Sequence, residues 1–227
     1  MEITSGLEIE FENDQIDLSS IKDSFNLVIM GDSSVGKSSI LERYCDDFFK
    51  KEKTSQYYLQ IYKKKYLYKN NKKYLIKFWD PPKFNNNCNN TEINMFNNCD
   101  GILYVCSYDN PASLTNINIW YQFLTQYIDL STKEMALIIN KKDLNDQEKL
   151  IKEEQIEKKS KDLQLQYFEV SAKTGDNIFN TFKVILNKMI DKYINENKTE
   201  DNENNNESDN DDYNNNEIEN EGGCFII

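Results

Sequence analysis

Continuous apolar runs, each followed by a glycine or a polar residue, recur along the chain and predict the strands of a buried sheet. The runs at residues 25–30 (FNLVIM), 101–106 (GILYVC) and 135–139 (MALII) lack the alternation typical of a strand with one face in water. Both faces of these strands should therefore be covered by helices. A shorter run at residues 167–170 (YFEV) precedes the last helical pattern and predicts one more strand.

Apolar positions that return every three or four residues lie between these runs and predict helices. The expected helical segments are 37–48, 112–126, 152–161 and 177–194. Two aromatic-rich runs, 57–68 and 74–79, flank the sequence KNNK, whose asparagines can adopt the positive φ of a hairpin turn. Strands that alternate with helices predict an α/β fold with a mostly parallel sheet and one antiparallel hairpin.

The two ends of the chain differ in composition from its middle. In residues 1–22, Leu7, Ile9 and Phe11 alternate with glutamates, a pattern that suits a short edge strand, but the acidic and weakly patterned context favours disorder. From residue 196 onward the chain is rich in Asn, Asp and Glu and cannot bury enough apolar area to fold. We therefore expect an N-terminal extension at 1–22, one domain at 23–195 and a disordered acidic tail at 196–227.

Composition excludes several kinds of chemistry and partner. The 227 residues carry a formal net charge of −12, which argues against binding to a nucleic-acid backbone, so no nucleic-acid partner is expected. The chain has no histidine, which excludes Ser-His-Asp and Cys-His nucleophiles and zinc sites built on histidine. Its 5 cysteines lack C-x-x-C spacing and suit a reducing cytosol. No apolar run reaches about 18 residues, so no transmembrane helix is expected.

The sequence GDSSVGKS at residues 31–38 predicts a phosphate-binding loop. It fits G-x-x-x-x-G-K-[ST] and lies between an expected strand and an expected helix, the context that this motif requires. The backbone N–H groups of such a loop can surround an anion, Lys37 can reach the β- and γ-phosphates, and the Ser38 hydroxyl can bind Mg²⁺. The expected phosphate-binding residues are Gly31, Asp32, Ser33, Ser34, Val35, Gly36, Lys37 and Ser38.

The sequence NKKD, from Asn140 to Asp143, indicates which base is bound. It follows the run at 135–139, and sheets of this type bind ligands at the C-terminal ends of their strands. The Asp143 carboxylate can accept hydrogen bonds from two neighbouring donors of guanine, a pair that adenine lacks. The N–H of Ala172 can donate to the guanine carbonyl. The expected guanine-binding residues are Asn140, Lys141, Asp143, Ser171, Ala172 and Lys173.

With these motifs in this order, the sequence resembles a small GTPase of the Ras superfamily, most closely the Rab branch. The resembling stretches are FNLVIMGDSSVGKSS, FWD, CDGILYVCSYDNPASLTNINIWYQFL, LIINKKDL and YFEVSAKTGDNIFNTF, which together cover about residues 24–194. The resemblance implies a P-loop G domain with a six-stranded sheet and five helices. It also implies bound Mg²⁺, a GTP/GDP cycle, a role in vesicle trafficking, and effector and exchange-factor partners that read two switch segments. A P-loop kinase or ATPase is disfavoured by the guanine motifs.

The second switch segment departs from the family pattern. Asp80 matches the aspartate that holds Mg²⁺ through water, but the following Thr-Ala-Gly-Gln of the family is replaced by Pro81, Pro82, Lys83 and Phe84. Phe84 cannot orient an attacking water, and the two prolines stiffen the segment. We expect slow GTP hydrolysis; the alternatives are a GTP-binding scaffold that hardly hydrolyses, or a Lys83 ammonium that acts on the γ-phosphate.

The first switch segment is also irregular, because the Thr-Ile-Gly of the family is absent. The magnesium-binding threonine of the family lies about 18–19 residues after the P-loop lysine, which here falls on Ser55 and Gln56. Ser55 or Thr54 could supply the hydroxyl, with a one-residue shift of the backbone. The segment that effectors would read consists of Lys53, Thr54, Ser55, Gln56, Tyr57, Tyr58 and Leu59.

The last residues, GGCFII, form a C-a-a-X sequence with Cys224 as the lipid acceptor. A terminal isoleucine favours geranylgeranylation, which implies a prenyl-chaperone partner and a peripheral position on the cytoplasmic face of a membrane. The acidic tail replaces the basic patch that usually strengthens such an anchor, so membrane binding should be weak and reversible.

Overall fold

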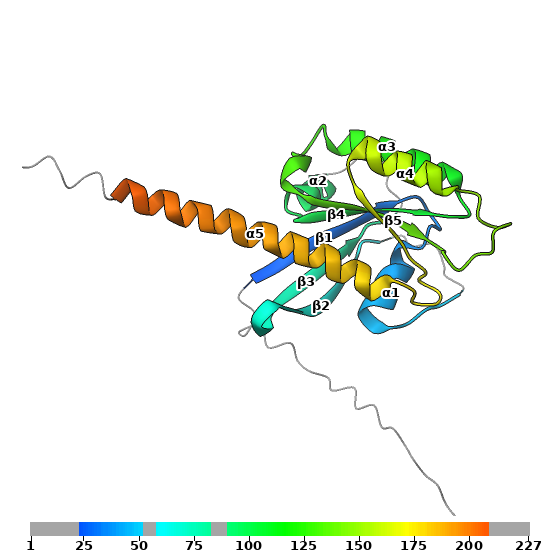
Figure 1. Cartoon of the computed structure of the whole chain (residues 1–227), viewed down its shortest axis with the longest axis horizontal. Helices are drawn as coiled ribbons and strands as arrows, with labels where there is room; N and C mark the ends of the chain where they lie inside the picture. Colours follow the sequence, from blue (N-terminus) through cyan, green and yellow to red (C-terminus); the bar gives the residue numbers. More distant parts are fainter. Residues whose placement is uncertain (1–22, 52–57, 83–89, 209–227) are drawn as a thin grey trace, which may run out of the picture.

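The computed structural model describes residues 23–51, 58–82 and 90–208, and its centre is a six-stranded sheet of order β2-β3-β1-β4-β5-β6 (Figure 1). The parallel strands are β1 (Asp23–Gly31), β3 (Lys72–Asp80), β4 (Gly101–Ser107), β5 (Glu134–Asn140) and β6 (Gln166–Glu169). Strand β2 (Gln60–Tyr68) is antiparallel to β3. The predicted mostly parallel α/β sheet with one antiparallel hairpin is confirmed.

Helices cover both faces of the sheet, as the apolar strands predicted. The bounds are α1 (Lys37–Asp46), α2 (Asn90–Asn97), α3 (Pro111–Leu124), α4 (Glu153–Leu163) and α5 (Ile178–Ser208). Side chains of α1 and α5 form one core cluster with the sheet, and side chains of α2, α3 and α4 form a second cluster on the opposite face. The apolar pattern did not reveal α2, a short helix in an asparagine-rich stretch. Among the described residues, no helix is both long and apolar enough to cross a membrane.

The hairpin turn between β2 and β3 follows the prediction from its asparagines. A 3-10 turn spans Lys69–Asn71, and Asn71 adopts a φ of 58°. On the α5 side of this hairpin, the Tyr66 hydroxyl donates to Asn187 at 2.7 Å, and Lys69 forms an ion pair with Asp191. Lys64 of β2 donates to the backbone oxygens of Tyr44 and Cys45 in the last turn of α1. The hairpin is therefore fastened to α1 and α5.

Helix α5 extends beyond the predicted end at residue 194. Its backbone is helical to Ser208 and projects away from the sheet (Figure 1). The disordered tail expected from residue 196 stays a prediction, although the described backbone is helical through residues 196–208. Composition limits the area that a segment can bury, whereas a helix that is already nucleated by packing gains one hydrogen bond per added residue. No Gly or Pro interrupts this stretch. The N-terminal extension at 1–22 and residues 209–227 lie outside the described residues.

All strand ends that carry predicted site residues lie at one edge of the sheet. The register aligns Gly31 of β1 with Val105 of β4, Ser107 of β4 with Asn140 of β5, and Ile139 of β5 with Glu169 of β6. Because these strands are parallel, the loops that follow them meet at the same edge.

Candidate functional site

The loop of residues 31–38 joins β1 to α1, the strand-to-helix context that the motif requires. Gly36 is the N-cap residue of α1 at a φ of 96°, and no described side chain caps this helix end. A Cβ at Gly31 would lie 2.2 Å from the Val105 carbonyl oxygen, and a Cβ at Gly36 would lie 2.2 Å from Asn140 Nδ2. Glycine is thus required at both positions, and the N–H groups of the first turn of α1 are left for an anion.

Lys37 folds back over this loop. Its Nζ donates to the carbonyl oxygens of Gly31 at 2.8 Å and Asp32 at 2.9 Å. Burial lowers the pKa of the Lys37 ammonium, and the carboxylates of Asp80 and Asp32 oppose this shift only in part. A phosphate in the loop would add negative charge beside the ammonium and would favour its charged form.

Ser38 and Asp80 bring two oxygen donors together from different elements. The Ser38 hydroxyl donates to Asp80 Oδ2 at 2.5 Å, and Asp80 is fully buried at the end of β3. A hydroxyl and a carboxylate suit Mg²⁺, which usually takes one or two protein ligands and completes its shell with phosphate and water. Among the described residues, no three or more His, Cys, Asp or Glu side chains are grouped so that they could hold a metal ion.

The side chain of Asn140 connects the phosphate-binding loop to the predicted base-binding loop. Its Nδ2 donates to the Val35 carbonyl oxygen at 2.9 Å, and its Oδ1 accepts from the Ala172 N–H at 3.1 Å. Asn140 was expected to contact the base, and the Ala172 N–H was expected to donate to guanine. In this structure both groups hold the two loops together, and their contacts with a base stay a prediction.

Asp143 lies beside this connection with its charge stabilised. Its Oδ1 accepts from the Ser171 hydroxyl at 2.6 Å, and its Oδ2 lies 3.3 Å from Lys173 Nζ. Burial alone would raise the pKa of the Asp143 carboxyl, but the hydrogen bonds from Ser171 and Lys173 outweigh burial and hold the pKa below its usual value. A charged carboxylate is the acceptor that two adjacent guanine donors require.

Lys141 is turned toward β4 rather than toward Asp143. It adopts a φ of 66°, and its Nζ lies 2.7 Å from Asp109 Oδ2. Burial raises the pKa of the Asp109 carboxyl, but hydrogen bonds from Lys141 and Ser107 reverse the shift.

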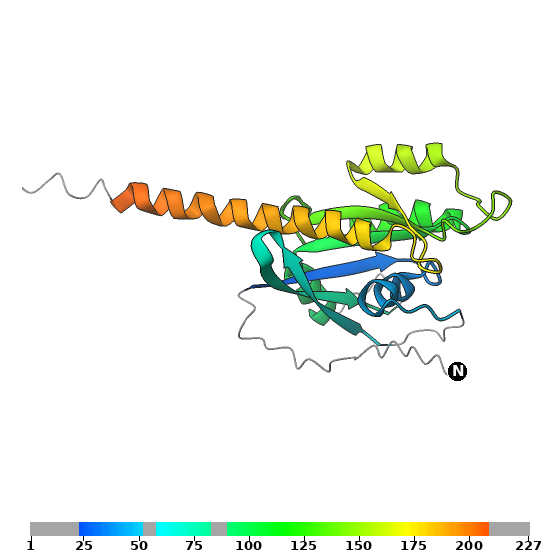
Figure 2. The same ribbon diagram turned by 60° about the horizontal axis from the view of Figure 1, so that its bottom comes forward.

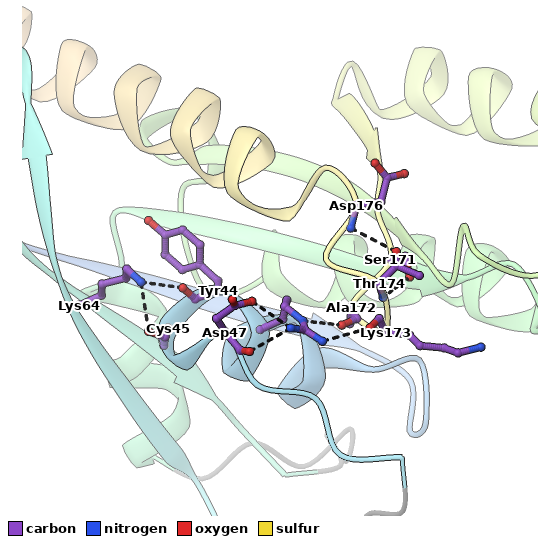
Figure 3. A network of polar contacts seen from close by, with 10 residues as sticks. Tyr44, Cys45, Asp47, Lys64, Ser171, Ala172, Lys173, Thr174 and Asp176 are labelled. Atoms are coloured by element: carbon purple, nitrogen blue, oxygen red, sulfur yellow. Dashed lines mark hydrogen bonds and ion pairs between the residues drawn. The ribbon is translucent and has the colours of Figure 1, made fainter. Parts of the chain in front are cut away.

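Arg43 of α1 is a site residue that the sequence pattern did not reveal. Its Nε and Nη2 donate to the carbonyl oxygens of Ala172 and Lys173, both at 3.0 Å, and its Nη1 pairs with Asp47 at 2.9 Å (Figure 3). The guanidinium thereby holds the loop that carries Ser171 and Ala172. Arg43 is the single arginine of a lysine-rich chain. That count was an available signal, because only arginine offers a rigid fork of donors.

Asn116 of α3 is a second site residue that the sequence pattern did not reveal. Its side-chain amide donates to Asp32 Oδ2 at 2.8 Å and so fixes the start of the phosphate-binding loop.

The switch residues are only partly described. Pro81 is buried, and Pro81 and Pro82 lie beside Gly31 and Lys37 around a cavity of about 10 Å³. Tyr58 and Leu59 are exposed. The other predicted residues of these segments, Lys53, Thr54, Ser55, Gln56, Tyr57, Lys83 and Phe84, and the predicted lipid acceptor Cys224, lie outside the described residues.

Comparison with known proteins agrees with this geometry. The family model described as Ras family matches residues 26–191. GTP-binding protein Rab-3D of Rattus norvegicus is 30% identical over 173 residues, which cover 76% of this chain and 77% of the relative. Ras-related protein Rab-3C of Bos taurus is 28% identical over 78% of this chain and 76% of its own length. Ras-related protein RabG2 of Dictyostelium discoideum is 24% identical over 78% of this chain and 87% of its own length. The chain therefore belongs to the Ras family and is a Rab-like small GTPase.

Proposed function

We propose that this chain is a guanine-nucleotide switch that binds GTP and GDP with Mg²⁺, hydrolyses GTP slowly and acts at intracellular membranes in vesicle trafficking. The observation that carries the proposal is the charged Asp143 carboxylate, held by Ser171 and Lys173 at the same sheet edge as the phosphate-binding loop. The relative Rab-3D, whose name describes it as GTP-binding, supports the same reading.

Different residues of this chain would bind different parts of the nucleotide. The N–H groups of residues 31–38 and the Lys37 ammonium would bind the phosphates, and Asp143 would bind the base. Ser38 would hold Mg²⁺ directly and Asp80 would hold it through water, and the bound ion would neutralise charge on the phosphates. Asn140 and Arg43 would also position the site, because Asn140 contacts Val35 and Ala172 and Arg43 contacts the loop that carries Ala172.

A second candidate function is a GTP-binding scaffold that does not hydrolyse appreciably. The observation that favours it is that Pro81 and Pro82 line the same small cavity as Lys37. Proline lacks a backbone donor and fixes φ, so these residues cannot supply an N–H to the γ-phosphate. The state of such a scaffold would be set by nucleotide exchange rather than by hydrolysis.

The proposal includes a lipid anchor and protein partners. Cys224 would carry a prenyl group that holds the protein at the cytoplasmic face of a membrane. A prenyl-binding chaperone would extract it, and exchange factors and effectors would read residues 53–59 and 80–84. The acidic tail would keep membrane binding weak, since anionic headgroups repel it.

Asp143→Asn should weaken binding of GDP. A charged acceptor of two hydrogen bonds is lost, so we expect a loss of about 1.5–3 kcal/mol, roughly 10- to 150-fold in Kd. Affinity for xanthosine diphosphate should rise, because the new amide can donate to it. Titration with fluorescent GDP checks this, and Asp146→Asn, an exposed carboxylate in the same loop, is the matched control. Unchanged GDP affinity in Asp143→Asn would show that the base site is wrongly assigned.

Arg43→Lys should accelerate GDP release by roughly tenfold, about 1.4 kcal/mol, because lysine cannot reproduce the two parallel donors to Ala172 and Lys173. Stopped-flow displacement of fluorescent GDP measures the rate. Asp47→Asn is the control, since it removes the ion pair and leaves the guanidinium in place. Equal release rates in wild type and Arg43→Lys would contradict the positioning role.

Single-turnover hydrolysis of GTP with Mg²⁺ should proceed on the order of 10⁻⁴ s⁻¹ or less. Phe84→Gln should raise the rate only modestly, because the prolines still restrict the segment. A fast wild type whose rate collapses in Lys83→Ala would instead make Lys83 catalytic. A wild type with no measurable turnover that nevertheless binds GTP tightly would favour the scaffold.

Cys224→Ser should shift the protein from a partial membrane fraction to the soluble fraction, whereas Cys88→Ser should not. Replacement of the acids at 217–221 by their amides, with Cys224 intact, should strengthen membrane binding most clearly at low salt. Cell fractionation measures both effects, and equal partition of wild type and Cys224→Ser would rule out the anchor.

A further inference from the structure

Although the chain has a negative net charge, its β2–β3 hairpin is basic. Residues 1–22 contain six acids and one lysine, while residues 23–195 contain 25 basic residues and 22 acids. From Gln60 to Trp79 there is no acidic residue at all, although this stretch includes seven lysines. The β2–β3 hairpin is therefore the most basic part of the domain.

The strand register gathers four of these lysines on one face of the hairpin. Residues opposite each other in an antiparallel pair share a face, and the register pairs Lys63 with Lys77, Lys65 with Leu75 and Leu67 with Lys73. We call the surface formed by Lys63, Lys65, Lys73 and Lys77 the lysine face. It lies opposite the face that α1 and α5 cover (Figure 2).

The lysine face lacks a counter-charge among the described residues. Lys63, Lys65 and Lys73 are exposed, Lys77 is half-buried, and none of the four forms an ion pair with a described residue. Lys63 and Lys77 are moreover directly opposite each other, and like charges in that position are destabilising. Lysines on the other face differ, since Lys64 binds the end of α1. An acidic partner would relieve the repulsion on the lysine face.

The lysine face borders a sheet edge. Among the described strands β2 has only β3 as a neighbour, so the outer row of its backbone N–H and C=O groups can pair with another strand. Edge lysines discourage pairing with a second copy of the chain. If the β2 strand of the second copy paired antiparallel with this edge, its lysines would lie against Lys63 and Lys65. A strand with acids at alternate positions would be accepted. Ile61 and Leu67, 43% and 61% exposed, offer apolar contacts on the same face.

Residues 7–12, with the sequence LEIEFE, have the pattern that this edge requires. In an extended strand Glu8, Glu10 and Glu12 would point to one face and the apolar side chains to the other. Beside β2, the glutamates would meet the lysine face. The apolar side chains would meet Tyr62 and Tyr66, which are partly buried against the core.

The connecting chain is long enough for this arrangement. The domain begins at Asp23 of β1, which is aligned with Tyr74 of β3 and through it with Tyr66 of β2. A position beyond β2 is three strand spacings, about 14 Å, from β1. Residues 13–22 can span up to about 33 Å.

We propose that residues 7–12, which lie outside the described residues, add in cis as a strand to the outer edge of β2, with their glutamates on the lysine face. In the sequence, the β2–β3 hairpin lies between the two segments that effectors are proposed to read, 53–59 and 80–84. A protein that pairs with the outer edge of β2 must displace the added strand. That consequence rests on the proposed function, whereas the docking itself does not.

Zero-length carbodiimide cross-linking of the full-length protein, followed by peptide mass spectrometry, tests the proposal. We expect cross-links from Glu8, Glu10 and Glu12 to Lys63 and Lys65. They should disappear in Lys63→Glu/Lys65→Glu and return between the same positions when Glu8→Lys/Glu10→Lys is added. The matched control is Lys158→Glu/Lys161→Glu, two exposed lysines of α4, which should leave the cross-links unchanged.

Hydrogen exchange of the β2 amides provides a second readout that does not depend on cross-linking chemistry. Exchange should rise severalfold in Glu8→Lys/Glu10→Lys/Glu12→Lys. It should fall again when Lys63→Glu/Lys65→Glu is added to the same chain. Identical β2 exchange in wild type and this variant would overturn the proposal. So would cross-links that join isotopically distinct chains, or lysine-face cross-links only to the acids at 217–221, since these identify a second copy or the tail as the occupant.

Discussion

The buried side chain of Asn140 is the constraint on which the nucleotide site depends. One amide holds the Val35 carbonyl of the phosphate-binding loop and the N–H of Ala172 in the base-binding loop. It also explains why residue 36 is glycine, because a Cβ there would lie 2.2 Å from the amide nitrogen. An unmade hydrogen bond at a buried amide costs about 1–3 kcal/mol, so the two loops favour a single relative position. The phosphate-binding loop and the base-binding loop therefore form one unit.

This unit is supported from outside by helix α1. Arg43 fastens the base-binding loop to α1, and the next residue, Tyr44, stacks on Phe182 of α5 with ring centroids 4.0 Å apart. Lys64 of β2 binds the carbonyl groups at the end of the same helix (Figure 3). The core between α1 and α5 thus supports the base-binding loop. Lys64 connects the β2–β3 hairpin to α1 and, through Arg43 of α1, to the same loop.

The sequence predicted those parts of the molecule in which spacing alone carries the chemistry. The mostly parallel α/β sheet with one antiparallel hairpin follows from local patterns, and so do the expected roles of the loop at 31–38 and of Asp143. The roles of Arg43 and Asn116 could not be predicted, because each acts through a partner far along the chain. The helical backbone of residues 196–208 was not predicted, because composition indicates how much apolar area a segment can bury and not whether an existing helix continues into it. The lysine face becomes apparent only when the register places Lys63 opposite Lys77.

The most direct test of the central claim, that one Asn140-centred unit binds guanine nucleotide, is the nucleotide that co-purifies with the full-length protein. Chromatography after denaturation identifies it, and circular dichroism verifies that wild type and Asn140→Ala are both folded. The account predicts GTP or GDP in a ratio near one per wild-type chain and a large loss of it in folded Asn140→Ala. Adenine nucleotide in the wild type, or undiminished guanine nucleotide in Asn140→Ala, would contradict it.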